Sequence, residues 1–246
     1  MRMQKVLLRS FLKEAQMIES SFNLLKSLKS YGLLAGKPSW WWKGAGSFEV
    51  VLGAILVQNT QWSKVESMLE SMRKASILSG DCQKDLQSLA QVDSMILQSH
   101  IIGLQRQKSA YIKSISQAIL TDFGSFESFK ENVDFEWLIT QKGIGRESAY
   151  AILNYACARE VMVVDRYTYK LLCVLGREIE DYEELRSFCE NGIKENLALV
   201  YELYPQDMSL AQIFARFHGK IVEFSKSKGD TKQLARDICL KILSLR

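Results

Sequence analysis

The chain has 246 residues, 47% of them apolar, so it is long enough to bury a sizeable core in one large domain or two small ones. Its 32 basic and 28 acidic residues give a formal net charge of +4, which is too mild to indicate a nucleic-acid partner by itself. Five cysteines without CxxC spacing argue against a disulfide framework or a zinc knuckle, and no apolar run approaches the roughly 18 residues of a membrane span, so we expect a soluble, cytoplasmic protein.

Apolar residues recur at helical spacing along the chain, and each such stripe predicts a helix that packs on the core. In chain order the stripes cover 24–33, 51–56, 65–72, 111–119 and 213–224. Only two prolines occur, no long Val/Ile/Thr alternation is present, and short breaks separate the stripes, which favours an all-α fold. The acidic stretch 177–190 predicts a solvated helix. The eight basic and three acidic residues of 214–246 predict either a phosphate-binding surface or a solvated helix face.

The stretch PSWWWKG, Pro38 to Gly44, has the most unusual composition in the chain. Three adjacent tryptophans on a turn cannot all pack in one direction, so we expect at least one of them to face a cleft or solvent. The alternative is that these rings hold helical lobes together as ordinary packing residues.

The stretch ITQKGIGRESAYAIL, Ile139 to Leu153, places two glycines two residues apart before a helix-forming run. It predicts a helix ending near Thr140, a tight turn over 143–145 and a second helix from about Arg146. The first amides of that second helix have no partner within the helix, so such a turn suits a phosphate. On these residues alone, a plain helix-helix turn with Ile144 in the core is an equal alternative.

Four motifs in this order resemble the endonuclease III superfamily of helix-hairpin-helix DNA glycosylases. They are VVLGAILVQNTQWSKVESML, IIGLQRQKSAYIKSI, the two-glycine turn, and the apolar run 161–164 that ends in Asp165. Within the superfamily the chain is most similar to the bacterial 3-methyladenine DNA glycosylases of endonuclease III type, over roughly 48–224. The resemblance implies a two-lobed helical fold, with a central domain of 44–157 that contains the hairpin and a terminal domain of 1–43 plus 158–246 that contains the aspartate.

The resemblance also implies an activity, that of a monofunctional DNA N-glycosylase excising alkylated purines such as 3-methyladenine in base excision repair. Asp165 would stabilise positive charge on the sugar and position a water, although capping the next helix is an ordinary role for such a residue. Glu147 stands where strand-cleaving members carry a Schiff-base lysine, so no lyase activity is expected. The iron-sulfur cluster of the family needs four cysteines in the last part of the chain. Only Cys239 follows the HGK stretch at 218–220, so we expect no cluster, no metal and no other cofactor.

The resemblance assigns contacts with double-stranded DNA that contains alkylated bases. A base must leave the stack before it is excised. Aromatic rings would then stack on it, a contact worth about 1–3 kcal/mol, and a cationic methylated purine would be attracted further. The implied base-pocket residues are Trp41, Trp42, Trp62 and one lysine. That lysine is Lys226, two turns beyond the HG[RK]-type stretch 218–220, or else Lys220, the last residue of this stretch. The implied DNA-binding residues are Gln58, which would enter the DNA, Leu104 and Gln105, which would wedge from the opposite strand, and the hairpin residues Lys142, Gly143, Ile144, Gly145 and Arg146.

Two other interpretations stay open. The first keeps the fold but makes the protein a glycosylase for oxidised or mismatched bases, or one that retains lyase activity through another lysine, Lys142 or Lys220. The second is a noncatalytic DNA-binding module that uses only the hairpin. In each case we expect a monomer in the bacterial nucleoid, and residues before about Ser20 lie outside the resemblance.

Overall fold

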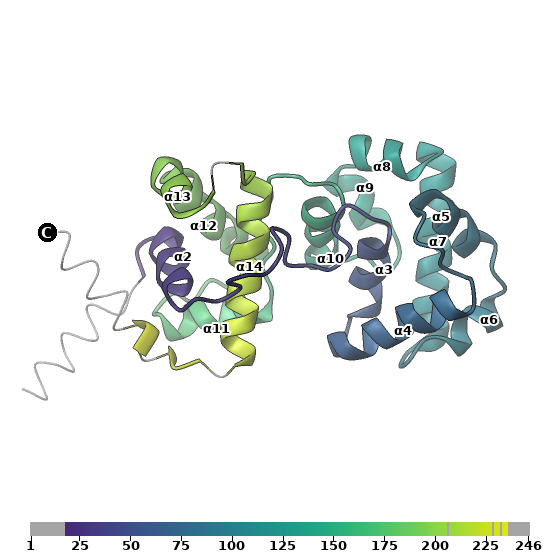
Figure 1. Cartoon of the computed structure of the whole chain (residues 1–246), viewed down its shortest axis with the longest axis horizontal. Helices are drawn as coiled ribbons and strands as arrows, with labels where there is room; N and C mark the ends of the chain where they lie inside the picture. Colours follow the sequence, from purple (N-terminus) through teal and green to yellow (C-terminus); the bar gives the residue numbers. More distant parts are fainter. Residues whose placement is uncertain (1–17, 206, 228, 232, 236–246) are drawn as a thin grey trace, which may run out of the picture. The chain divides into compact units, whose positions relative to one another are not determined.

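The structure is a computed structural model that describes residues 18–205, 207–227, 229–231 and 233–235. Within these residues the chain is helical and contains no strand, so the predicted all-α fold is confirmed (Figure 1). None of the helices described combines the length and the apolar character of a membrane span. With the labels of Figure 1, the helices are α2 (Ser21–Ser30), α3 (Glu49–Leu56), α4 (Trp62–Lys74), α5 (Cys82–Gln91), α6 (Ser94–Ser99), α7 (Gln105–Phe123), α8 (Phe126–Asn132), α9 (Phe135–Thr140), α10 (Arg146–Ala151), the π-helix η1 (Ile152–Ala156), α11 (Arg166–Val174), α12 (Tyr182–Lys194), α13 (Leu197–Leu203) and α14 (Leu210–Lys226).

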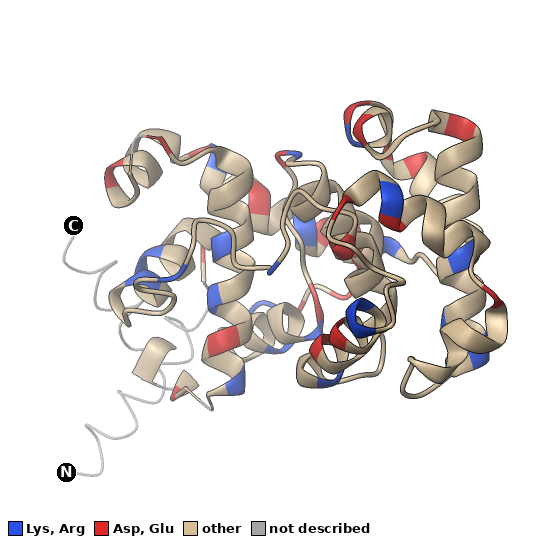
Figure 2. Ribbon diagram, turned by 45° about the vertical axis from the view of Figure 1, so that its right-hand side comes forward, with Lys and Arg blue, Asp and Glu red and all other residues tan. Residues whose placement is uncertain are grey.

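The chain divides into two compact units. Unit 1 comprises the described residues of Met1–Trp41 and Glu160–Arg246, and unit 2 comprises Trp42–Arg159. The chain therefore enters unit 2 between the second and third tryptophans of the WWW run, whereas the sequence predicted a central domain of 44–157. Figure 2 shows basic and acidic residues interspersed along the helices of each unit.

Unit 2 is organised by α3 and α7. Helix α7 buries Ile112, Ile115 and Ile119 on one face and packs against α3, α5, α6 and α8. Helix α3 reads EVVLGAIL, and every residue after its first is buried, as expected for a segment that is apolar on all sides. These two central helices were among the predicted stripes.

The short helices of unit 2 start at residues that cap them. Asp81, Asp93, Ser125 and Asp134 each stand at an N-cap, and their side chains accept hydrogen bonds from first-turn amides of α5, α6, α8 and α9. A side-chain cap of this kind stabilises a helix by about 1 kcal/mol. Local capping therefore sets the start of these helices, none of which was among the predicted stripes.

Unit 1 is built around α14, whose apolar stripe packs against α2 and α11. Arg216 and Lys220 lie on the same helix and are also buried, with exposed fractions of 8% and 2%. The predicted basic surface over 214–246 is therefore wrong for these two residues, because their side chains turn inward to hold a loop. Lys226 is exposed at the C-terminal end of α14.

Candidate functional site

Asp165 is the N-cap residue of α11 in unit 1. Its Oδ1 accepts hydrogen bonds from the Thr168 amide at 2.8 Å and from the Thr168 hydroxyl at 3.0 Å. The buried run 162–164 leads into it, and the Met162 amide donates to Glu190 Oε1 at 2.8 Å, which fastens this run to α12. The side chain of Asp165 is 13% exposed, so the carboxylate is held rigidly but can still be reached.

The surroundings of Asp165 favour its ionised form. Its Oδ2 lies 3.5 Å from Nε2 of His218 on α14. Burial alone would raise the pKa of Asp165, but the neighbouring His218 imidazole, with the hydrogen bonds from Thr168, outweighs burial and lowers the pKa below its ordinary value. The carboxylate is therefore negatively charged at neutral pH.

Trp41 packs against the same part of α14. Its ring meets the His218 ring edge to face, with centroids 5.3 Å apart and an interplanar angle of 81°. A Cβ on Gly219 would lie 2.4 Å from Cγ of Trp41, so this helical position must be glycine for the indole to approach. In unit 1, therefore, α14 brings Trp41, His218 and Asp165 together.

Two buried cations hold the loop that precedes Trp41. Arg216 donates to the carbonyl oxygens of Pro38 at 2.7 Å and Leu34 at 2.6 Å, and Lys220 Nζ donates to that of Leu33 at 2.5 Å. Carbonyl groups of an irregular loop need such donors where they are removed from water. The sequence did not predict this role, because the resemblance gave Lys220 only a possible place in the base pocket or as an amine nucleophile and gave Arg216 no role.

Because the ammonium of Lys220 is buried, we expect the stability of the wild type, compared with that of Lys220→Met, to increase with pH. Burial, with the charges of Arg216 and Lys29, lowers the pKa of Lys220 from its ordinary 10.5 to about 8. Between these values the unfolded chain binds a proton that the folded chain does not, so the free energy of unfolding rises with pH. Relative to Lys220→Met, the wild type should gain up to about 3 kcal/mol from pH 8 to pH 10.5. Urea unfolding of both proteins across this range measures the difference, and parallel stability curves would contradict it.

Trp42 packs inside unit 2. Its ring centroid lies 5.1 Å from that of Trp62, at an interplanar angle of 80°, and 5.1 Å from that of Tyr155. Tyr155 is fully buried and lies in the π-helix η1, a local irregularity of a kind frequent at functional sites. Gly53 of α3 lies beside this ring, where a Cβ would be 3.2 Å from Cζ2 of Trp42. The three tryptophans of the WWW run are half-buried; Trp41 packs on His218 in unit 1, and Trp42 packs on Trp62 and Tyr155 in unit 2.

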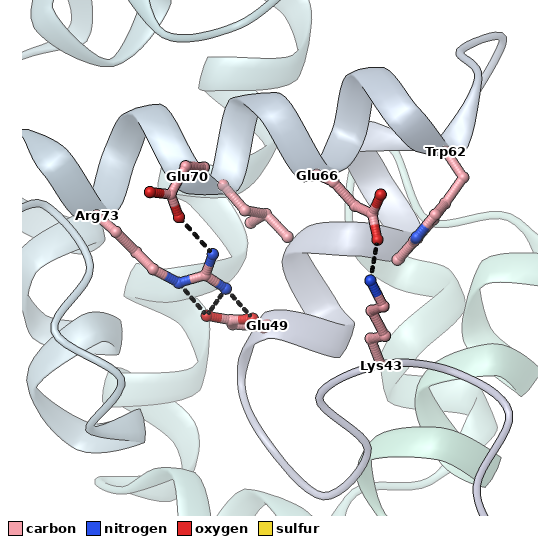
Figure 3. A pocket seen from close by; sticks show the side chains of 7 residues that line it. Lys43, Glu49, Trp62, Glu66, Glu70 and Arg73 are labelled. Atoms are coloured by element: carbon pink, nitrogen blue, oxygen red, sulfur yellow. Dashed lines mark hydrogen bonds and ion pairs between the residues drawn. The ribbon is translucent and has the colours of Figure 1, made fainter. Parts of the chain in front are cut away.

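Trp62 also lines a surface pocket of about 250 Å³ in unit 2 (Figure 3). Two exposed or half-exposed ion pairs border this pocket, Lys43 with Glu66 at 2.5 Å and Arg73 with Glu49 at 2.6 Å. The hydrogen bond and charge of Lys43 lower the pKa of Glu66 in spite of its partial desolvation. A third carboxylate of the lining, Glu70, lies 3.5 Å from Arg73, so the pocket gives Trp62 a polar margin with one more acidic than basic side chain.

The two-glycine stretch forms the predicted hairpin. Helix α9 ends at Thr140 and α10 begins at Arg146, with Gly145 as its N-cap. Gly143 has φ +90°, and a Cβ there would lie 2.1 Å from Cδ2 of Tyr111. Ile144 is buried, whereas Lys142, Gly145 and Arg146 are exposed. The turn therefore combines a core residue with an exposed rim, so both interpretations made from the sequence describe part of it.

The end of α3 is tied to this hairpin. Gln58 Nε2 donates to the carbonyl oxygen of Gly143 at 2.8 Å. Lys108, buried on α7, donates to the carbonyl oxygen of Leu56 at 2.8 Å and to Oγ1 of Thr60 at 2.7 Å, and burial lowers its pKa. Lys108 lies in the quoted IIGLQRQKSAYIKSI motif, yet its role was missed because a lysine next to polar residues gives no signal of burial.

Leu104 and Gln105 stand at the start of α7. Leu104 is the N-cap, with φ +52°, and it is 56% exposed. A left-handed conformation is uncommon for a leucine, and it presents an apolar side chain to solvent. Gln58 forms its side-chain hydrogen bonds with Ala54, Gly143 and Ser148 instead of with this pair. Cys239, on which the prediction about an iron-sulfur cluster depends, lies outside the described residues.

A two-unit helical fold, with a two-glycine hairpin in one unit and an ionised aspartate at a helix N-cap in the other, defines the class of helix-hairpin-helix DNA repair proteins. Residues 52–195 match the HhH-GPD superfamily of base excision DNA repair proteins, and the chain belongs to this family. The resemblance inferred from the four motifs is confirmed.

Individual relatives agree with this membership. The crystal structure of the H. pylori 3-methyladenine DNA glycosylase MagIII bound to 1,N6-ethenoadenine is 51% identical, with a TM-score of 0.84 over 86% of this chain and 99% of that chain. A protein of Methanocaldococcus jannaschii whose name places it among DNA repair glycosylases, MJ1434, is 29% identical over 82% of this chain and 86% of that protein. A non-covalent endonuclease III–DNA complex shares the fold, with 14% identity and a TM-score of 0.58 over 89% and 95% of the two chains.

Proposed function

We propose that this protein is a monofunctional DNA N-glycosylase that excises alkylated purines, 3-methyladenine among them, from double-stranded DNA. The observation that carries the proposal is the similarity to the H. pylori 3-methyladenine glycosylase, at 51% identity over 99% of that enzyme. The ionised carboxylate of Asp165 supports it, since base excision needs a negative charge near the sugar.

Asp165 is the proposed catalytic residue. Cleavage of the N-glycosidic bond develops positive charge on the deoxyribose, which a neighbouring carboxylate stabilises while it positions a water for attack. A methylated purine such as 3-methyladenine is already cationic and leaves without protonation by a general acid. Because Oδ1 is engaged by Thr168, we assign the reaction to the side of Oδ2.

The proposed base-pocket residues are Trp41, Trp42, Trp62 and Lys226. The half-buried state of the three indoles supports a stacking role, because part of each ring remains open to a base. Tyr155 backs Trp42 and so belongs to the support of this ring. Lys226, exposed at the end of α14, fits a pocket residue better than Lys220, whose ammonium is buried against Leu33.

The hairpin in unit 2 is the proposed DNA-backbone contact. The exposed Lys142 and Arg146 supply positive charge beside the first amides of α10, a geometry that suits a phosphate. Gln58 would have to release the Gly143 carbonyl before it could fill the gap left by an extruded base. Leu104 and Gln105 are the proposed wedge on the opposite strand, and the exposure of Leu104 supports this.

The absence of lyase activity is part of the proposal. Glu147 occupies the first turn of α10, where a carboxylate cannot form an imine. Lys220 has the lowered pKa of a possible amine nucleophile, but it is 2% exposed and donates to Leu33. We also propose that the protein acts as a monomer in the bacterial cytoplasm, at the nucleoid, without a metal or other cofactor.

Incubation of the purified protein with methylated duplex DNA tests this function. We expect release of free 3-methyladenine and an intact strand until alkali is added, because the product is an abasic site. Strand nicking without alkali would favour a lyase, and binding without base release would favour a noncatalytic module. Release of an oxidised pyrimidine in place of a methylated purine would change the substrate class.

A further inference from the structure

His218 is close to two groups to which the proposed function gives a role, Asp165 and Trp41. Its ring is 5% exposed and sits on α14, with Nε2 3.5 Å from Asp165 Oδ2, and it also meets the Trp41 ring edge to face at a centroid distance of 5.3 Å. The Trp41 ring is itself fixed by its close approach to Gly219. Packing against Trp41 therefore restricts rotation of the imidazole.

The two oxygens of Asp165 are held by different elements. Oδ1 is bound through the capping box of α11, by the amide and hydroxyl of Thr168. Oδ2 faces His218 on α14, a helix that is distant from Asp165 in the sequence. The cap alone fixes one oxygen and leaves the carboxylate plane free to turn about it, whereas a second group at Oδ2 determines that plane.

We propose that His218 is a positioning residue that orients Oδ2 of Asp165 for the reaction and links the carboxylate to Trp41. This inference rests on the proposed glycosylase function. Either a neutral imidazole with its proton on Nε2 or an imidazolium can donate toward Oδ2, so the positioning role does not depend on the charge of the ring. Loss of the ring should act on the rate of the chemical step more than on DNA binding.

Two substitutions at His218 test the inference. Glutamine can place its amide near the position of Nε2 and donate toward Oδ2, whereas leucine fills similar space without a donor. We expect His218→Leu to lower the single-turnover rate of base release on the order of 10²-fold, the size of effect caused by misplacing a reacting group by about 1 Å. His218→Gln should recover most of that loss. His100→Leu, at the only other histidine of the sequence and in unit 2, is the matched control and should keep the wild-type rate.

A binding measurement separates positioning from a merely structural role. Duplexes carrying either a cationic azasugar or a neutral abasic analogue at the target position are compared, because an oriented carboxylate favours only the cation. The wild type and His218→Gln should prefer the cationic duplex, and His218→Leu should lose this preference while its affinity for the neutral duplex is unchanged.

The inference is overturned if His218→Leu keeps the wild-type rate and preference, or if leucine and glutamine reduce the rate equally. Thermal unfolding of each variant verifies that the protein remains folded. Failure of the wild type to release any base would overturn the proposed function, while the preference between the two duplexes would still decide the role of His218.

Discussion

Replacement of Asp165 by asparagine is expected to lower base release by at least about 10³-fold while the protein stays folded and binds DNA. Asparagine is as good an N-cap residue as aspartate, so its side-chain oxygen can still accept from the Thr168 amide and α11 keeps its start. It lacks the negative charge that would stabilise the developing cation on the sugar. The substitution therefore separates the catalytic role of Asp165 from its capping role, which both belong to one carboxylate.

The measurement is single-turnover release of 3-methyladenine, with DNA affinity determined in parallel. Asp165→Ala should lose activity to the same extent and also destabilise unit 1 by about 1 kcal/mol, because the cap is removed as well. Asp181→Asn is the matched control, since Asp181 caps α12 in the same unit through the amides of Glu183 and Glu184 and has no proposed role in catalysis. More than a tenth of wild-type activity in Asp165→Asn would exclude Asp165 as the main stabilising charge.

The sequence was most informative where the structure depends on neighbours along the chain. Apolar periodicity predicted the cores of α2, α3, α4, α7 and α14, since each of these helices presents a long buried stripe. The two glycines predicted the hairpin with its boundaries, because Gly143 needs a positive φ and the next helix starts directly after Gly145. The π-helix η1 was not predicted, since no local pattern distinguishes it from the end of α10.

The candidate site was predictable only in part, because its supporting contacts join residues far apart in sequence. Asp165 was found through its motif, but His218, which faces its carboxylate, comes from α14, and Glu190, which binds the Met162 amide of the preceding run, comes from α12. Glu190 ends an acidic stretch that predicted a solvated helix, and it is buried with Arg186 and Lys194 as ion-pair partners. A charged residue that is buried and paired has the same letter in the sequence as one that is solvated, so composition cannot separate the two.

Substitution of Gly143 by alanine is expected to destabilise unit 2 by about 3 kcal/mol and to weaken DNA binding at least about tenfold, the equivalent of about 1.4 kcal/mol. The glycine has φ +90°, which an alanine adopts only with strain, and the added methyl would lie 2.1 Å from the Tyr111 ring. Tyr111 would have to leave its place on α7, where its hydroxyl accepts a hydrogen bond from Gln107, or the turn would have to shift. A shifted turn would also disturb the Gly143 carbonyl to which Gln58 donates, so the hairpin and the end of α3 should both be affected.

Urea unfolding and the affinity for a duplex measure these two effects, and Gly145→Ala is the matched control within the same turn. Gly145 has φ −94°, and no atom lies within 4 Å of the position that an alanine methyl would occupy, so its replacement should change stability by no more than about 1 kcal/mol. If Gly145→Ala loses DNA affinity at unchanged stability, a phosphate approaches this backbone closely. The added methyl has no protein atom near it, so it would then clash only with the bound DNA. If Gly143→Ala keeps both the stability and the DNA affinity of the wild type, the proposed hairpin contact is contradicted. A turn that tolerates this substitution does not depend on the backbone geometry that would bring the amides of α10 to the DNA.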